Sequence, residues 1–264
     1  MPTWQAIQSR QHLNAGWRPP TDYRHTQQDA LAPITISEFS QSLPHYSLAF
    51  TQQSGEYQLV AILSLQSGLN LFVDANNNRW QAPYIPACYR SYPFNLLPNQ
   101  KGDLVVCIDS DSGLFHEQAE ADDKPLFNAD GQPTETLQKT IDFMQQRHKQ
   151  QILTQQAVNQ LAEHNLIQPW SVQIKTGSGE NDVQDVKGLF RIDEKSLKVL
   201  KSDALSNMIQ SGALAIAYAQ LFSMNQINQL AERAKYHARQ QSKPEEPDIE
   251  KLFGNDDILS FDNI

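Results

Sequence analysis

The sequence predicts an α+β fold in which predominantly antiparallel sheets are combined with a long helix in the middle of the chain and a helical region toward the C-terminus. Short apolar or alternating stretches separated by turn residues, which are typical of strands, occur throughout residues 33–109. Apolar residues then recur at three- and four-residue steps over 133–165, and this helical period returns over 212–241. A sheet-forming first half followed by a helix-rich second half indicates α+β architecture.

The first 65 residues predict an arm followed by strands. Residues 1–30 show no sustained period of 2 or 3.6 and are expected to form an irregular N-terminal arm. Ile34 and Ile36 then alternate around a threonine, as in a strand. A short helical turn is expected within 38–43, and strands over 46–51 and 57–65.

The next segment predicts a hairpin, a proline-rich connection and a buried strand. Residues 70–80 centre on asparagines that tolerate the left-handed backbone of a tight reversal, so we expect a hairpin. Four prolines over 81–98 forbid a central strand or a long helix and indicate an ordered connection with one helical turn near 87–90. The continuous apolar run 103–109 predicts a buried strand.

Helical patterns dominate the second half. The Pro-Thr-Glu sequence at 133–135 predicts a helix start, and the helix is expected to run to about 165. The strands 170–175 and 183–192 are expected to pair through a turn at 177–182. Asp193 is a candidate cap for a short helix to 200, followed by helices over 204–210 and 212–241.

Composition excludes several classes of protein. The chain has 264 residues, 39% hydrophobic, and a formal net charge of −9. It contains no run of roughly 20 consecutive apolar residues that could span a bilayer, and no long basic block of the kind that binds nucleic acid. The first 18 residues lack a secretion-signal pattern, and Cys88 and Cys107 lie in apolar surroundings typical of reduced core thiols. We therefore expect a cytoplasmic protein.

Residues 1–242 are expected to form one domain, and 243–264 an acidic tail. The tail carries seven acidic residues against two lysines, which is −5 of the net charge of −9. Its apolar residues exceed what solubility requires, so it either folds back onto the domain or binds a partner. The apolar positions proposed for partner binding are Leu252, Phe253, Ile258, Leu259 and Phe261.

Several sequence blocks, in order, resemble the SapC family of proteobacterial proteins over about residues 20–235. The most extensive is the run from Asn70-Leu-Phe-Val-Asp74 through Arg79-Trp80 to Tyr89-Arg90-Ser-Tyr92-Pro93-Phe94. Further blocks are Cys107-Ile-Asp109, Leu126-Phe127-Asn-Ala-Asp130-Gly131, Gly188-Leu-Phe-Arg191-Ile-Asp193 and Ala217-Tyr218-Ala219-Gln220-Leu221. The resemblance implies a gene neighbourhood of TonB-dependent receptors, flavin-dependent halogenase-like proteins and cupin oxygenases. It supplies no catalytic residue set.

No metal, cofactor or catalytic site is predicted. Asp109, Asp111, Gly113 and Glu120 imitate a calcium loop, but Leu114 stands where that loop requires glycine. The seven histidines form no short-spaced ligand pair, although ligands distant in sequence can still converge. The chain lacks GxSxG, Walker A and GxGxxG motifs, and Gly-Ser-Gly at 177–179 is interpreted as a turn.

The best candidate binding site is an aromatic and arginine cluster in and beside the proline-rich connection. Guanidinium groups next to aromatic rings can hold a carboxylate, a phosphate or an extended peptide. The same residues can equally serve to pack the connection against the domain. The candidate binding residues are Arg79, Trp80, Tyr84, Arg90 and Tyr92.

Three functional hypotheses follow. The first is a non-catalytic accessory factor that binds a protein or peptide and is linked to a surface or TonB-dependent uptake system. The second is an enzyme or enzyme subunit acting on a peptide or small metabolite beside a halogenase-like or cupin protein; a cleft joining Arg79, Arg90 and a histidine would favour it. The third is a structural subunit that forms homo-oligomers through the helix 212–241.

Overall fold

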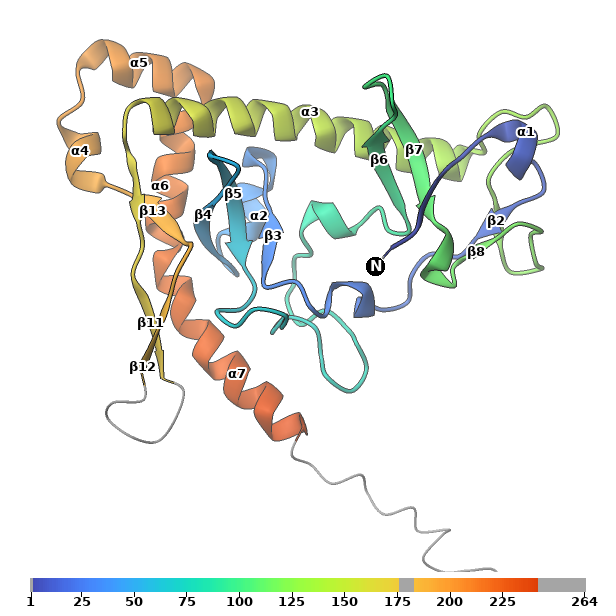
Figure 1. Ribbon diagram of the computed structural model, residues 1–264, viewed down its shortest axis with the longest axis horizontal. Coiled ribbons are helices and arrows are strands. Elements are labelled where there is room, and N and C mark those ends of the chain that lie inside the picture. The colour runs from blue at the N-terminus through green and yellow to red at the C-terminus, as the bar shows by residue number, and fades with distance from the viewer. Residues whose placement is uncertain (1, 176–182, 242–264) are drawn as a thin grey trace, which may run out of the picture.

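The computed structural model describes residues 2–175 and 183–241 and confirms the predicted fold class (Figure 1). The described residues form four antiparallel sheets, and one long helix, α3 (Glu135–Glu163), extends across the molecule above the two that contain residues 47–62 and 94–109. A series of C-terminal helices covers one end. None of the helices within the described ranges is long and apolar enough to cross a membrane.

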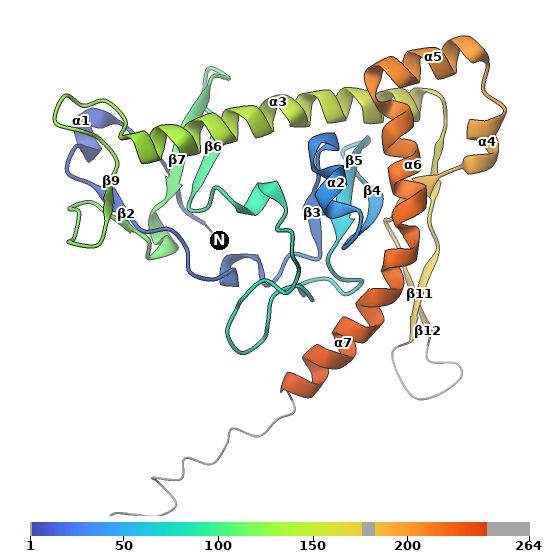
Figure 2. The same ribbon diagram turned by 180° about the vertical axis from the view of Figure 1, so that it is seen from behind.

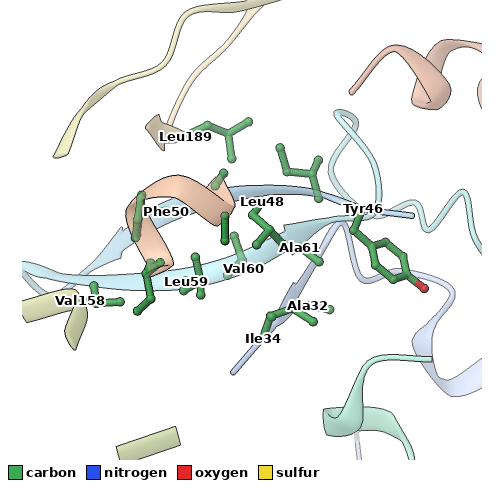
Figure 3. Packing of buried hydrophobic residues seen from close by; sticks show 14 of the residues in the cluster. Ala32, Ile34, Tyr46, Leu48, Phe50, Leu59, Val60, Ala61, Val158 and Leu189 are labelled. Atoms are coloured by element: carbon green, nitrogen blue, oxygen red, sulfur yellow. The ribbon is translucent and has the colours of Figure 1, made fainter. Parts of the chain in front are cut away.

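The larger sheet has five strands in the order β10 (Ile167–Pro169), β13 (Phe190–Ile192), β4 (Ser47–Gln53), β5 (Glu56–Ile62) and β3 (Leu31–Pro33). The β4–β5 hairpin turns at Ser54 and Gly55, which both have positive φ, as a tight hairpin requires. Its apolar residues form the first core with side chains from α3 and the segment before β13 (Figure 3). The side chains labelled there include Tyr46, Leu48, Phe50, Leu59, Val60, Val158 and Leu189.

The second sheet has the order β1 (Trp4–Ala6), β7 (Leu104–Asp109) and β6 (Phe94–Pro98). Next to it, β2 (Gly16–Trp17) pairs with β8 (Phe115–His116) and β9 (Lys124–Pro125). Side chains of these two small sheets and of the start of α3 form a second, smaller core. Its buried members are Ala15, Trp17, Phe94, Ile108, Phe115, Leu126, Leu137 and Met144.

Helix α3 connects the two cores. Its start is fixed by Thr134, whose hydroxyl accepts a hydrogen bond from the Leu137 N–H at 3.4 Å. The 29 residues that follow extend about 43 Å. Met144, in the first half of the helix, packs into the second core, whereas Val158 and Leu161 pack into the first.

The C-terminal helices are α4 (Glu194–Lys198), α5 (Ser202–Ser211), α6 (Ala213–Ser223) and α7 (Ile227–Gln241), with a 3-10 turn η5 (Met224–Gln226) before α7. Figure 2 shows α6 beside β4. The buried Gln220 side chain accepts from the Ile192 N–H at 2.9 Å and donates to the Leu48 carbonyl at 3.2 Å. It thereby bridges β13 and β4, which are joined by a single residue pair, Phe190 and Phe50.

The N-terminal arm is more regular than predicted. It contributes β1, β2, a short helix α1 (Ser9–His12) and a 3-10 turn η1 (Arg24–Thr26). Trp4 in β1 lies opposite Asp109 in β7. Since the hydrogen-bond partners of β1 and β2 lie about a hundred residues further along the chain, no local periodicity revealed them.

Two further segments differ in detail. Alternation at Ile34 and Ile36 does not give a strand, because Thr35 and Glu38 form a capping box that starts η2 (Ile36–Glu38), followed by α2 (Phe39–Ser42). The predicted 70–80 hairpin is reduced to one bridge, between Val73 and Trp80, because the Asp74 carboxylate accepts two backbone N–H groups and closes a loop instead.

The connection 81–98 contains the predicted helical turn, η3 (Ala87–Tyr89), but its last five residues form β6. Strands β11 (Val172–Lys175) and β12 (Val183–Val186) pair antiparallel as predicted. The chain then breaks at Gly188, with φ of 89°, so that β13 joins the larger sheet instead of extending the hairpin. The predicted turn 177–182 and the tail 243–264 lie outside the described residues.

Candidate functional site

Two of the predicted binding residues, the half-buried Trp80 and the buried Tyr84, pack against the first core. The Trp80 indole N–H donates to both the Tyr46 hydroxyl and the Tyr84 carbonyl, each at 3.0 Å. The buried Tyr84 hydroxyl donates to Glu38 at 2.8 Å. The side-chain donors of both residues are thus hydrogen-bonded within the domain, which agrees with the interpretation that they pack the proline-rich connection against it.

Glu38 is the centre of this arrangement, although it is only 5% exposed. One carboxylate oxygen accepts from the Tyr84 hydroxyl and the Ala87 N–H, both at 2.8 Å. The other accepts from the N–H and hydroxyl of Thr35 at 2.9 and 2.8 Å. We call Glu38, Thr35, Tyr84 and Ala87 the glutamate network. Its four hydrogen bonds compensate the carboxylate for its loss of water and tie the proline-rich connection to the first core.

The two predicted arginines do not meet. The exposed Arg90 donates to the Tyr84 hydroxyl at 3.2 Å, and its guanidinium carbon lies 5.1 Å from the centre of the Phe143 ring. Arg79 is exposed on the 70–80 loop, and no side-chain partner is found for it within residues 2–175 and 183–241. None of the cavities reported for residues 2–175 and 183–241 is lined by both arginines and a histidine, so the cleft that would favour the enzyme hypothesis has no support here.

Tyr92, the fifth predicted residue, lies beside a different site. Its hydroxyl donates to Asp109 at 2.8 Å, and its ring stacks on His25 with a centroid distance of 3.8 Å and an interplanar angle of 6°. Both rings border a cavity of about 200 Å³ where the first and second cores meet. We call it the seam pocket. It is lined by Trp4, His25, Cys88, Tyr89, Tyr92, Phe94, Asn95 and Arg147.

The seam pocket is assembled from five elements, of which only η3 and β6 lie close together in sequence. Trp4 comes from β1, His25 from η1, Tyr89 from η3, Phe94 from β6 and Arg147 from α3. Tyr89 belongs to the first core and Phe94 to the second, so the pocket exists because α3 holds the two cores side by side without merging them. Pockets commonly occur at such junctions.

Three side-chain atoms of the lining residues are buried without a hydrogen-bond partner, namely the Arg147 Nε, the His25 Nε2 and the Tyr89 hydroxyl. The Arg147 Nε–H is buried and has no hydrogen-bond acceptor, and in the described part of the chain this side chain forms no ion pair. The His25 Nε2 is likewise buried without a hydrogen bond. Because buried donors and acceptors are normally satisfied, groups left open at a cavity indicate a place for a ligand or for solvent.

Burial shifts two ionisable side chains of the pocket, His25 and Cys88, toward their neutral forms. Burial lowers the pKa of His25 to about 4, against the opposing effect of Asp22 and Asp109. Burial, reinforced by Glu38, raises the pKa of the Cys88 thiol to about 12, although Arg147 opposes it. A nucleophilic cysteine needs a thiolate at neutral pH, so these shifts do not favour cysteine–histidine catalysis.

A possible metal-binding group lies elsewhere, where His116, Glu120 and Asp123 place their ligand atoms within 4.8 Å of one another. Arg18 already binds Glu120 at 2.5 Å and Asp123 at 2.7 Å, and His116 contacts Asp123 at 2.7 Å. The arrangement is an ion-pair cluster with its own cation.

The segment that resembles a calcium loop begins at Asp109, and the side chain of this residue holds together parts of the fold. The Asp109 carboxylate accepts from the Thr3 N–H at 2.9 Å and the Asp111 N–H at 3.3 Å, in addition to the Tyr92 hydroxyl. These contacts attach β1 to the end of β7.

A second and wider hollow, of about 680 Å³, lies between β13, α4 and the end of α6. Tyr218 and Phe222 stack at 5.7 Å on its side, and Phe222 is 74% exposed. Arg191 also borders it, with a buried Nε that has no partner. We call it the α6 hollow.

Comparison with protein-family models matched the SapC model over residues 7–230. The chain belongs to the SapC family. The matched region of this SapC-family chain includes every residue of the seam pocket except Trp4, and both arginines of the predicted cluster. Neither a comparison with curated proteins nor one with solved structures found a match.

Sequence reasoning identified one lining residue of the seam pocket, Tyr92, among its five candidates. The sequence also placed Cys88 in apolar surroundings, but it did not predict that this residue borders a cavity. Arg147 lies in the polar run Gln-Gln-Arg-His-Lys at 145–149, which reads as a solvated helix face. The predicted partner-binding residues of the tail, including Phe253 and Phe261, lie outside the described residues.

Proposed function

We propose that this SapC-family chain is a non-catalytic cytoplasmic accessory protein that binds a protein or peptide partner, and that the seam pocket receives one group of that partner. The single observation that carries the proposal is Arg147, a cation with a buried, unpartnered Nε at a cavity whose other walls are largely aromatic. Aromatic residues and arginine dominate the energetically important contacts of protein interfaces. The link to a surface or uptake system comes from the family resemblance.

The alternative, an enzyme or enzyme subunit, has less support. The pocket brings a histidine and an arginine together, but the imidazole is neutral at pH 7 and the neighbouring thiol is protonated. General acid–base and nucleophilic catalysis work best when a group titrates near the working pH. Binding without transformation makes fewer demands on these residues.

Affinity capture from native lysate tests the proposal, using the full-length chain, Arg147→Gln and a matched control, Arg191→Gln, which makes the same change at the α6 hollow. We expect a protein that is retained by the wild type and by Arg191→Gln and is reduced at least tenfold with Arg147→Gln. The captured protein is then purified and its direct binding is measured. If direct binding is absent, or if Arg147→Gln binds as tightly as the wild type, the proposed role of the pocket is wrong.

A version ending at Ser242 separates the tail from the body. Retention of the partner by this shortened chain supports recognition by the domain, as proposed here. Loss of the partner in the shortened chain alone assigns recognition to the tail residues 243–264 and contradicts the pocket proposal.

A further inference from the structure

We infer that the ligand group of the seam pocket is a carboxylate attached to an apolar or aromatic body about the size of one amino-acid side chain. The inference deepens the proposed function, on which it rests for the location of binding. It follows from the charge, donor geometry and volume of the pocket.

The charge argument starts from the side chains of the lining. Arg147 is their one formal cation, and none of them is a carboxylate. Four acidic groups influence these lining residues, and within residues 2–175 and 183–241 none of the four forms an ion pair with Arg147. Asp109 accepts three hydrogen bonds, Glu38 accepts four, and Asp22 pairs with Arg24 at 2.9 Å. Asp29, the fourth, lies beside Tyr89. A guanidinium left without an internal anion is suited to an anion from outside, and its planar fork matches a carboxylate best.

A single negative charge fits better than a phosphate dianion. His25 is held neutral by burial, so it adds no second positive charge near pH 7. Phosphate sites normally add lysines, several backbone N–H groups or a helix N-terminus, whereas Arg147 lies in the middle of α3. The pocket therefore offers one fork and one charge.

The other lining residues of the pocket indicate the size and polarity of the group to which the carboxylate is attached. Four aromatic residues, Trp4, Tyr89, Tyr92 and Phe94, line this cavity of about 200 Å³. That is less than the roughly 300 to 1,000 Å³ typical of drug-sized ligand sites, and corresponds to one side chain or a small organic acid. Burial against aromatic rings favours an apolar or aromatic group. Asn95 also lines the cavity, and because its Oδ1 accepts the Leu96 N–H at 3.0 Å, the polar group that it can add is its NH2 donor.

Two sources carry this chemistry, namely the C-terminal residue of a peptide and a free small acid. The test measures binding to the full-length protein by calorimetry, with tryptophan fluorescence, to which Trp4 of the pocket contributes, as a second signal. The probes are N-acetylphenylalanine, its amide, a tripeptide ending in phenylalanine with a free or an amidated C-terminus, and inorganic phosphate. We expect both free carboxylates to bind at least tenfold more tightly than the matched amides.

Arg147→Gln should weaken carboxylate binding at least tenfold, with Arg191→Gln unchanged. Arg147→Lys should recover only part of the affinity, because lysine restores the charge without the fork. Tighter binding of the tripeptide identifies a peptide terminus as the source, and tighter binding of the acetylated amino acid identifies a small acid. Both outcomes support the inference.

Three results would overturn it: equal binding of acid and amide, phosphate binding more tightly than either carboxylate, or no binding by any probe to a folded protein. Thermal unfolding of each variant confirms that it is folded. Since a protein partner can still be captured through Arg147 when every carboxylate probe fails, failure of this inference is distinguishable from failure of the proposed function.

Discussion

The glutamate network and the seam pocket place opposite charges in neighbouring parts of the molecule, but the two charged groups differ in how many internal hydrogen bonds they make. Glu38 and Arg147 both border a cavity of about 20 Å³, room for about one water molecule, that adjoins Cys88. Glu38 has four internal hydrogen bonds, while the Nε of Arg147 has none. A buried charge that is fully satisfied serves folding, whereas a charge left open at a cavity is available for binding.

The largest expected effect is the loss of the glutamate network. Glu38→Ala removes the acceptor of four donors, so the Tyr84 hydroxyl, the Ala87 N–H and the polar groups of Thr35 lose their partner in the interior. Since each unsatisfied buried donor costs about 1 to 3 kcal/mol, we expect a loss of about 3 kcal/mol or more. Urea unfolding measures this change.

The control for that experiment is Glu163→Ala, at the exposed C-terminal end of α3. Its free energy of unfolding should stay within about 0.5 kcal/mol of the wild type. Equal stability of the Glu38→Ala and Glu163→Ala variants would contradict a folding role for the network.

The next effect is a dependence of stability on pH that originates in the seam pocket. The pKa of His25 is about 4 in the folded chain, below the ordinary value of 6.5, because burial disfavours the charged ring. Because protonation of His25 is harder in the folded than in the unfolded chain, its contribution to the free energy of unfolding is fully present above pH 6.5. That contribution is lost as the pH falls toward 4, by about 3 kcal/mol in total.

His25→Gln cannot titrate and should show a smaller loss of stability between pH 7 and pH 4. Urea unfolding of wild type and variant at both pH values measures the difference, in which the contributions of the acidic residues cancel. Identical pH profiles would show that His25 is not held neutral by the fold.

A smaller effect is expected at the edge shared by the pocket and the second sheet. Tyr92→Phe removes the hydrogen bond to Asp109 but keeps the ring that stacks on His25. Asp109 retains its two backbone donors, so we expect a loss of about 1 kcal/mol, with carboxylate binding preserved. A loss of binding with unchanged stability would instead make the Tyr92 hydroxyl a ligand contact.

Local pattern was sufficient for elements that are stabilised locally, and insufficient for those that depend on distant pairing. Helix α3 was predictable because its period and its Thr134 cap lie in one continuous stretch. The β1–β7 pair was not, because residues 4 and 109 are brought together only by the fold. The same reason hid the seam pocket, whose His25 and Arg147 come from opposite ends of the first 150 residues.

The cluster of aromatic and arginine residues teaches a related lesson. Residue type and proximity in sequence marked Trp80 and Arg90 as neighbours, but the fold turns the indole into the first core and leaves the guanidinium on the surface. Cis geometry at the peptide bond before Pro93 belongs to the same irregular connection. Direction of side chains from an irregular backbone cannot be obtained from periodicity, since there is no period to follow.

The smallest effect on stability is expected for Arg147→Gln, and this variant tests the difference between the glutamate network and the seam pocket most directly. Arg147→Gln removes a charge that has no internal partner, so we expect the free energy of unfolding to change by no more than about 0.5 kcal/mol or to rise. The same variant should lose partner and carboxylate binding. Urea unfolding and calorimetry on one preparation measure both quantities. A destabilisation as large as that of Glu38→Ala would place Arg147 among the groups that hold the fold together and remove the distinction between the two regions.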